Sequence, residues 1–204
     1  QSYEDGQGRK GSNVVAVKAA PLPNADILVL SAHHDSVPTA YGANDNASGV
    51  AALLYVAELL QDIPTDTEVR FISFTDEENG KCGSRFYTSS LAQAEKERMV
   101  GNIQFDMLGG LGTEDALVCT MDGEANWVSD LLQQQDSALR RGRETASDHA
   151  SLQLAGVPSV LLMQNGRGYL YHSAADTAEQ LNPYAIARTA ERAGAAVKEI
   201  LSAD

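Results

Sequence analysis

The stretch ILVLSAHHD, residues 27–35, joins a strand-like run to a group of residues that can bind metal. Residues 27–32 are rich in Ile, Val and Leu, which favours a buried β-strand. His33, His34 and Asp35 follow this run directly. In α/β proteins, ligands bind beyond the carboxyl ends of parallel strands. The stretch therefore predicts an α/β fold with a functional site at this end of the strand.

Strand-like and helix-like segments alternate along the rest of the chain. Further strands are expected at residues 13–19, 68–74, 100–105, 116–120 and 158–163. Helices are expected at residues 47–60, 84–98, 124–139 and 183–201. This alternation predicts a three-layer α/β/α sandwich around a mostly parallel, mixed central sheet. Residues 1–11 are polar and Gly-rich, and we expect them to form a flexible lead-in to one domain spanning residues 1–204.

Composition excludes several classes of partner. The chain has 15 Lys and Arg against 28 Asp and Glu, a formal net charge of −13. Nucleic acids and anionic membranes need a basic surface, so neither is an expected partner. No apolar run approaches the roughly 20 residues needed to span a bilayer. No signal peptide is visible, although the chain starts at Gln1 and not at Met. Cys82 and Cys119 either pair or remain free thiols, and their spacing does not decide between these states.

Histidines and carboxylates follow the other predicted strands too. Asp45 lies in the Asn-Asp-Asn turn before the helix at 47–60, and Glu77 and Glu78 follow the strand at 68–74. Asp106 comes directly after the strand at 100–105, and His172 follows the Gly-rich loop after the strand at 158–163. Because the ends of parallel strands meet at one edge of a sheet, we expect these side chains to converge.

The types of residue indicate a metal site. Two histidines and three or four carboxylates with no cysteine suit zinc, and they also admit cobalt or manganese. Five ligands that share one carboxylate suit two ions roughly 3.5–4 Å apart, the arrangement of two-metal hydrolases. One further carboxylate must stay off the metal to move the proton of the attacking water. The adjacent Glu77 and Glu78 can divide these two tasks.

Six motifs follow one another along the chain: SAHHDSV (31–37), GANDNASG (42–49), DEENGKCGS (76–84), FDMLG (105–109), SDHA with AGVP (147–150 and 155–158) and YHSAADT (171–177). In this order they resemble the motifs of the zinc aminopeptidases of metallopeptidase family twenty-eight, a group that includes secreted bacterial leucyl-type aminopeptidases. The resemblance runs from about residue 13 to residue 201. It implies a phosphorylase/hydrolase-like fold and two zinc ions.

The resemblance also implies how the metal ligands are divided. His33 and Asp106 would hold one zinc ion, Glu78 and His172 would hold the other, and Asp45 would bridge both. His34 stands where the family tolerates several residues, so it has no expected role as a ligand.

Three further residues have roles implied by the same resemblance. Glu77 would be the general base and then the acid that protonates the leaving amine. Asp35 would orient His33 through its second ring nitrogen. Tyr171 would donate a hydrogen bond to the oxyanion. In relatives the peptide bond after the bridging Asp is cis, so a cis bond is expected between Asp45 and Asn46.

The implied function is removal of the N-terminal residue from peptides, outside the cell or at its surface. A carboxypeptidase, an amidohydrolase or a glutaminyl cyclase on the same scaffold are alternatives. Cyclases usually carry Trp just before the last ligand histidine, where this chain has Tyr171. A non-catalytic zinc- or peptide-binding module, or a domain with empty metal sites, are further alternatives. Oligomeric state is not indicated by the sequence.

The segment Ser147-Asp148-His149 contains the three residue types of a serine hydrolase triad. Triad members are adjacent in space and not in sequence, and the chain has no G-x-S-x-G motif. We therefore expect this segment to start a helix and to form part of a pocket wall.

Overall fold

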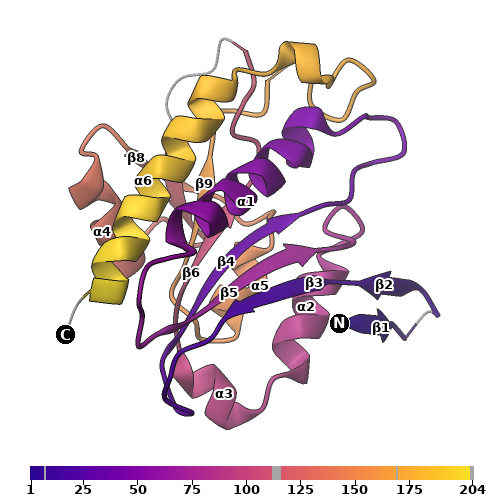
Figure 1. Ribbon diagram of the computed structural model, residues 1–204. Coiled ribbons are helices and arrows are strands. Elements are labelled where there is room, and N and C mark those ends of the chain that lie inside the picture. Colours follow the sequence, from indigo (N-terminus) through magenta and orange to yellow (C-terminus); the bar gives the residue numbers. More distant parts are fainter. Residues whose placement is uncertain (7, 112–115, 169, 203–204) are drawn as a thin grey trace.

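The computed structural model describes residues 1–6, 8–111, 116–168 and 170–202, and its centre is a seven-stranded sheet (Figure 1). The order of strands across the sheet is β3-β5-β4-β6-β9-β7-β8. Their bounds are β3 (Val14–Lys18), β4 (Ile27–His33), β5 (Glu68–Phe74), β6 (Met99–Phe105), β7 (Leu117–Thr120), β8 (Arg140–Arg143) and β9 (Ser159–Met163). Every predicted strand is present.

The sheet is mixed and mostly parallel. The neighbours β5, β4, β6 and β9 are parallel to one another, and β7 is parallel to β8. Strand β3 is antiparallel to β5, and β7 is antiparallel to β9. The carboxyl ends of the four central parallel strands consequently share one edge of the sheet, which is where the functional residues were expected.

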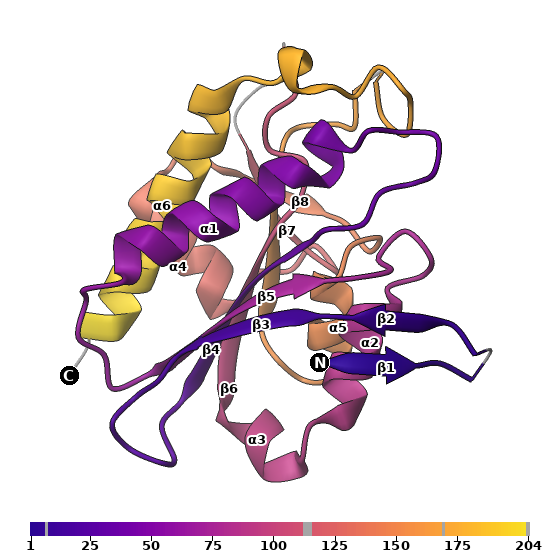
Figure 2. The same ribbon diagram turned by 45° about the vertical axis from the view of Figure 1, so that its right-hand side comes forward.

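Helices cover both faces of the sheet, which confirms the three-layer prediction (Figures 1 and 2). Helices α1, α4 and α6 pack on one face, while α2 and α5 pack on the other. The helices are α1 (Ser48–Leu60), α2 (Cys82–Ser90), α3 (Gln93–Arg98), α4 (Trp127–Gln135), α5 (His149–Leu154) and α6 (Pro183–Ser202), with the short turns η1 (Ala43–Ala47) and η2 (Ala178–Gln180).

Strand β4 shows how the sheet separates two apolar cores. Successive side chains of a strand point to opposite faces. Leu28 and Leu30 pack with α1 and α6, whereas Ile27 and Val29 pack with α2 and α5. Each fully buried side chain of this kind contributes roughly 1.5–3 kcal/mol through removal of apolar surface from water. Burial on both faces therefore anchors β4 rigidly, and His33 is its last residue.

Three details differ from the sequence-based expectations. The helix expected at 84–98 is two helices, because Leu91 and Ala92 are extended between α2 and α3. The helix expected at 124–139 is the shorter α4, which begins where Asn126 and Ser129 form a reciprocal capping box. Strand β8 was not predicted, because its four basic and glycine residues carry no apolar alternation on this exposed edge.

The N-terminal segment contains regular structure that its composition did not indicate. Strands β1 (Ser2–Glu4) and β2 (Lys10–Ser12) pair antiparallel, while residue 7 lies outside the described residues. Tyr3 is buried, stacks on Phe86 and donates a hydrogen bond to Asp76 at 2.6 Å. One tyrosine in three-residue strands is too weak a pattern to reveal a hairpin from sequence.

Neither a disulfide nor a membrane-spanning helix is present among the described residues. Cys82 and Cys119 are both free thiols. Within the described residues, no helix combines the length and the apolar character that crossing a bilayer requires.

Candidate metal centre

The five predicted ligands meet at the edge formed by the carboxyl ends of the parallel strands. His33 ends β4, Asp106 directly follows β6, and Glu78 lies in the loop after β5. Asp45 lies in η1, just before α1, and His172 lies in the loop between β9 and η2. The convergence inferred from strand order is thus present in the structure.

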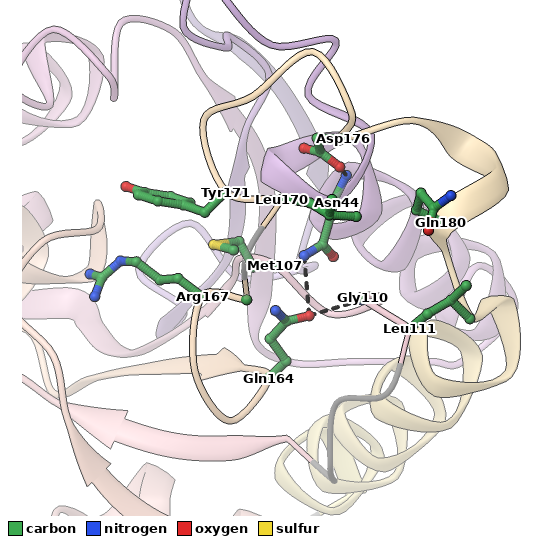
Figure 3. Close-up of a pocket in the computed structure, with 11 residues that line it drawn as sticks. Asn44, Met107, Gly110, Leu111, Gln164, Arg167, Leu170, Tyr171, Asp176 and Gln180 are labelled. Carbon is green, nitrogen blue, oxygen red and sulfur yellow. Dashed lines mark hydrogen bonds between the residues drawn. The ribbon is translucent and has the colours of Figure 1, made fainter.

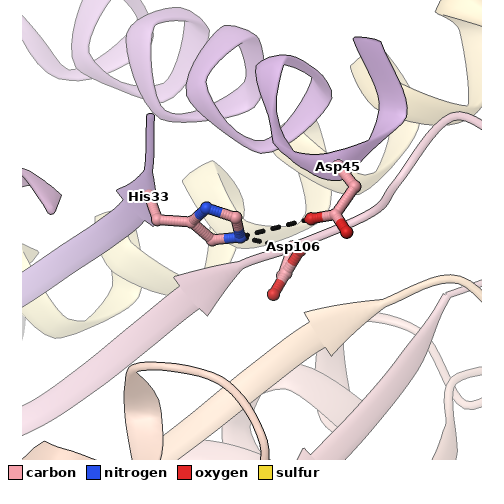
Figure 4. Close-up of side chains that lie close together, drawn as sticks. All are labelled: His33, Asp45 and Asp106. Carbon is pink, nitrogen blue, oxygen red and sulfur yellow. Dashed lines mark ion pairs between the residues drawn. The ribbon is translucent and has the colours of Figure 1, made fainter. Parts of the chain in front are cut away.

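These side chains form two groups of three that share Asp45. In the first, His33 Nε2 lies 3.4 Å from Asp45 Oδ1 and 3.5 Å from Asp106 Oδ1 (Figure 4). In the second, His172 Nε2 lies 3.3 Å from Asp45 Oδ2 and 3.0 Å from Glu78 Oε2. Asp45 therefore turns one carboxylate oxygen to each group.

The spacing of these atoms fits zinc. Bonds of about 2.1 Å to nitrogen and oxygen in a tetrahedral site place neighbouring ligand atoms about 3.4 Å apart. Three of the four contacts above lie within 0.1 Å of that separation, and the fourth is shorter. Buried atoms of Glu78, Asp106 and His172 also have no hydrogen-bond partner among the described residues. Buried polar atoms are normally paired, so these residues fit a bound cation.

The charge of the first group is concentrated around His33. Burial alone would lower the pKa of its imidazole, but the carboxylates of Asp106, Asp35 and Asp45 outweigh burial and raise that pKa well above its usual value. The raised pKa means that the surrounding carboxylates favour a positive charge at His33. These carboxylates thus carry more negative charge than the nearby side chains neutralise.

The turn that carries Asp45 is fixed from two sides. The Asp45–Asn46 peptide bond is cis, which confirms that expectation. The carboxylate of Asp176 accepts hydrogen bonds from the backbone N–H of Asn44 at 2.7 Å and of Asp45 at 3.1 Å. The sequence alone does not indicate this role of Asp176. The one available signal was its place in the motif YHSAADT, where it is the second-to-last residue and lies four residues after His172.

Asn46 ties the Asp45 turn to the strand that carries Asp106. Its side-chain nitrogen donates to the carbonyl of Phe105 at 2.9 Å. Its side-chain oxygen accepts from the N–H of Met107 at 3.2 Å and of Gly49 at 3.0 Å. A Cβ atom on Gly49 would lie 2.5 Å from the Phe105 carbonyl oxygen, so only glycine permits this close approach.

Asp35 supports the site differently from the expected pattern. The second ring nitrogen of His33 is 3.1 Å from the backbone carbonyl oxygen of Asp35 and 3.6 Å from its carboxylate. The carboxylate instead accepts hydrogen bonds from the backbone N–H of Glu77 at 3.0 Å and of Glu78 at 3.1 Å. Asp35 thereby fixes both the His33 ring and the loop that carries the two glutamates.

Glu77 lines the same pocket as Asp45, Glu78 and Asp106, but it belongs to neither group of three. Burial raises the pKa of its carboxyl to about 9, and the Asp148 carboxylate nearby adds to this rise. Glu77 therefore lies beside the ligands as a further titratable group, and the pKa of its carboxyl is set first by burial and then by the surrounding charge.

The three residues Ser147, Asp148 and His149 do not form a triad. Ser147 donates a hydrogen bond to Asp106 Oδ2 at 2.8 Å. Asp148 accepts from the hydroxyl of Ser84, and the His149 ring binds the carbonyl oxygen of Glu144 at 2.8 Å. Ser147 lines the pocket and α5 begins at His149, as expected. The contact from Ser147 to Asp106 is a support that the sequence reasoning did not specify.

Tyr171 covers the more exposed side of the site. Its ring stacks on that of His172, with centroids 3.6 Å apart. Tyr171, Met107 and Arg167 also separate the pocket beside the ligands from a neighbouring one. Figure 3 shows this second pocket, where Gln164 accepts hydrogen bonds from Asn44 and from the backbone of Gly110. His34, by contrast, is exposed and binds Ser73, consistent with no role as a ligand.

The backbone at the site occupies uncommon conformations. Among the described residues other than glycine, Asp76, Lys81, Met107 and His172 have φ between 54° and 61°. Asp76 precedes Glu77, and Met107 follows Asp106. Such left-handed conformations cost roughly 1–3 kcal/mol each and tend to occur at functional sites.

Comparisons with known proteins agree with this geometry. The chain is 31% identical over 202 residues to aminopeptidase YwaD of Bacillus subtilis, covering 92% of this chain and 44% of that protein. The solved structure of an aminopeptidase from Aneurinibacillus sp. strain AM-1 is 37% identical, with a TM-score of 0.88 over 93% of this chain and 48% of that one. BSAP, a zinc aminopeptidase from Bacillus subtilis, is 29% identical, with a TM-score of 0.93 over 97% of this chain and 52% of that one.

This chain therefore spans about half the length of the relatives that it matches. The sequence profile of peptidase family M28 matches residues 13–197, which include every residue of the two ligand groups, Glu77 and Asp35. The match to the profile, the fold and the ligand geometry together show that the chain belongs to peptidase family M28.

Proposed function

We propose that this chain is the catalytic part of a two-zinc aminopeptidase, which hydrolyses the peptide bond after a free N-terminal residue. The observation that carries the proposal is the pair of ligand groups that share Asp45, with Glu77 in the same pocket and outside both groups. His33, Asp45 and Asp106 would hold one ion, and Asp45, Glu78 and His172 the other. Cations held by these residues would supply Lewis-acid chemistry, which polarises a scissile carbonyl and makes water a nucleophile at neutral pH.

In this proposal Glu77 moves the proton. Its carboxylate accepts a proton from the attacking water as the water oxygen bonds to the carbonyl carbon. The C–N bond then breaks, and the leaving nitrogen takes that proton from Glu77 and departs as an amine. Tyr171 stacks on His172, which supports a role for its hydroxyl as a hydrogen-bond donor to the carbonyl oxygen as that oxygen gains negative charge.

A free amino terminus fits the charge of the pocket. Asp45, Glu77, Glu78 and Asp106 all line it, and their carboxylates attract an ammonium group. A substrate with an acetylated N-terminus lacks that positive charge. The proposal therefore distinguishes an aminopeptidase from an enzyme that acts at the carboxyl end or on a blocked substrate.

The test is a panel of aminoacyl-p-nitroanilides, each supplied with a free and an acetylated amino group. The zinc-loaded protein should release nitroaniline from free substrates only, and a chelator should abolish release. Release from acetylated substrates would indicate another amidohydrolase, and cyclisation of N-terminal glutamine would indicate a cyclase. No chelator-sensitive release from any substrate would remove the proposal.

Replacement of Glu77 by Gln separates catalysis from metal binding. Without the carboxylate, kcat should fall roughly 10²–10⁴-fold, the contribution typical of a general acid–base group. Zinc content, measured by elemental analysis, should stay at the wild-type level because Glu77 is not a ligand. The matched control is Glu58→Gln on the exposed side of α1, which should change neither quantity. A Glu77→Gln variant with wild-type turnover would show that the proton moves by another route.

A further inference from the structure

One wall of the pocket beside the ligands has no part in the proposed chemistry. The carboxylates of the two ligand groups line part of the pocket. Met107, Leu161 and Met163 supply an apolar surface. Glu144 and Arg167 line the pocket as well. If the scissile carbonyl sits at the ligands, the side chain of the N-terminal residue must occupy the remaining space. Glu144 and Arg167 then face that side chain.

The backbone holds Glu144 in place. Its Oε1 accepts hydrogen bonds from the N–H groups of Thr145 at 2.9 Å and Ala146 at 3.0 Å. Its carbonyl oxygen is also bound to the ring of buried His149. Burial alone would raise the pKa of the Glu144 carboxyl, but the two N–H donors and Arg167 lower it. Glu144 is therefore an ionised group whose position does not depend on Arg167.

Arg167 is held less firmly. Its Nη2 donates to Glu144 Oε2 at 2.8 Å, and its side chain is 42% exposed against 17% for Glu144. The guanidinium lies 5.5 Å from the centre of the Tyr171 ring, and Figure 3 shows the two side chains extending in the same direction. Gly166 and Gly168, on either side of Arg167, both have positive φ, at 88° and 72°. Arg167 thus projects from a glycine-flanked turn and depends on Glu144 and Tyr171 for its position.

The balance of charge follows from this arrangement. Among the described residues that line the pocket, Arg167 is the only Lys or Arg. In the proposed function, Asp45, Glu77, Glu78 and Asp106 surround the reacting carbonyl and the N-terminal ammonium group. Glu144 is then the remaining carboxylate that lines the pocket, and it is paired with Arg167. A Lys or Arg side chain of a substrate would therefore find no unpaired carboxylate there and would meet the positive charge of Arg167. Burial of an ammonium group without a partner is costly, whereas an uncharged side chain avoids that cost.

We propose that the Glu144–Arg167 ion pair sets the side-chain preference of this pocket, and that Glu144 is a latent binding site for cationic side chains which Arg167 blocks. The inference rests on the proposed function, because it assigns this space to the N-terminal side chain. Wild-type protein should prefer uncharged N-terminal residues. Removal of Arg167 should leave the Glu144 carboxylate in place and open it to a substrate cation.

The test compares substrates that differ only in charge. Lysine and norleucine have the same unbranched four-carbon chain, and lysine adds the ammonium group. The ratio of kcat/KM for lysyl- over norleucyl-p-nitroanilide cancels any change in the chemistry common to both. Arg167→Met should raise this ratio about tenfold, equivalent to about 1.4 kcal/mol. Arg167→Lys, which keeps the positive charge, should leave the ratio near that of the wild type.

A double variant assigns the effect to Glu144. Adding Glu144→Gln to Arg167→Met should return the ratio to near the wild-type value, because the anion that attracts lysine is gone. A ratio that does not rise in Arg167→Met would overturn the inference, and so would a rise that persists in the double variant. Arg167→Gln provides a second neutral variant should Arg167→Met fold poorly.

A binding measurement keeps this inference distinct from the proposed function. L-lysinamide and L-norleucinamide carry the same free amino group and carbonyl, and calorimetry on the zinc-loaded proteins measures their Kd without turnover. The ratio of the two Kd values should shift about tenfold towards lysinamide in Arg167→Met. An unchanged Kd ratio contradicts the inference even if the enzyme is active. Absence of turnover together with the shifted ratio would contradict only the proposed function.

Discussion

The two ligand groups differ in how the fold supports them, although they share Asp45. His33 and Asp106 stand at the ends of β4 and β6, two central strands buried on both faces, and the His33 side chain is only 1% exposed. Glu78 and His172 lie in loops, and the His172 side chain is 34% exposed. One group is thus part of the hydrophobic scaffold, whereas the other is attached to it by loops.

This difference indicates that the two positions have different tasks. Sites built on strands are held more precisely than sites on loops. The strand-based group keeps a nearly fixed geometry because moving His33 would disturb both apolar cores. The loop-based group adjoins Tyr171 and Glu77, and its His172 side chain is partly exposed, so in the proposed function a substrate would approach from this side. We expect the buried group to contribute to folding stability and the loop group mainly to metal binding.

Replacement of the shared ligand should have the largest effect. Asp45→Asn removes the negative charge that both groups share. The amide also offers one ligand oxygen where the carboxylate offers two, so one group loses a ligand and the other keeps only an uncharged one. We expect kcat/KM to fall at least about 10³-fold, or about 4 kcal/mol in transition-state stabilisation, and zinc content to fall below one ion per chain. Nitroanilide hydrolysis and elemental analysis measure the two quantities.

The matched control for Asp45→Asn is Asp66→Asn, the same chemical change at an exposed residue between α1 and β5. It should leave both activity and zinc content unchanged. If Asp45→Asn instead retained wild-type zinc content, the two groups would bind their ions independently. The idea that Asp45 couples the strand-based group to the loop-based group would then be wrong.

The positions of these ligands were predictable for a specific physical reason. In a parallel sheet the strand ends share one edge, so a polar residue just after an apolar strand can be placed without knowing the packing. His33, Glu78 and Asp106 all follow that rule. The supporting contacts do not follow from it, because they depend on how separate loops approach one another. Asp176 reaches the Asp45 turn across 131 residues, and nothing in its local sequence specifies that partner.

The same distinction explains which parts of the fold were not predicted from the sequence. Strands β4 and β6 were predicted because burial on both faces leaves a continuous apolar run. Strand β8, which consists of Arg140, Arg141, Gly142 and Arg143, is held by pairing with β7 at an exposed edge and shows no such run. The ion pair of Glu144 with Arg167 was not predicted either. It joins two loops 23 residues apart, and local sequence does not specify how separate loops approach one another.

The second prediction separates the two groups by stability. In excess chelator, His33→Asn should lower the free energy of unfolding by about 3 kcal/mol, because it leaves the buried carboxylates of Asp45 and Asp106 without a cationic partner. His172→Asn should cost less than about 1 kcal/mol, as is usual for a partly exposed ion pair. Urea unfolding monitored by circular dichroism measures both values.

Metal content provides an independent check on that second prediction. After dialysis against limiting zinc, His172→Asn should retain about one ion per chain, since His33, Asp45 and Asp106 remain intact. The structure supports this expectation because that group keeps its strand-end geometry without His172. Equal destabilisation by the two substitutions would show that burial does not distinguish the groups.

The smallest expected effect concerns His149, which lies behind the buried group. Burial lowers the pKa of its imidazole to about 4, and the Glu144 carbonyl and nearby carboxylates only partly oppose this. Its ordinary value is about 6.5, so the unfolded chain binds a proton in the range from 6.5 to 4 that the folded chain does not. Stability from this residue is therefore complete above pH 6.5 and is lost as the pH falls towards 4. The loss from pH 7 to pH 5 should be about 2 kcal/mol.

A His149→Gln variant isolates this contribution, because glutamine does not titrate while the neighbouring carboxylates remain. Both proteins should be unfolded by urea in excess chelator, so that proton competition for zinc ligands does not enter. The wild type should lose about 2 kcal/mol more than the variant between pH 7 and pH 5. Parallel stability curves would mean that His149 takes up a proton in the folded state as readily as in the unfolded one. The interior next to Asp106 would then tolerate a charged imidazole. The strand-based group would be less well shielded from water than its difference from the loop-based group implies.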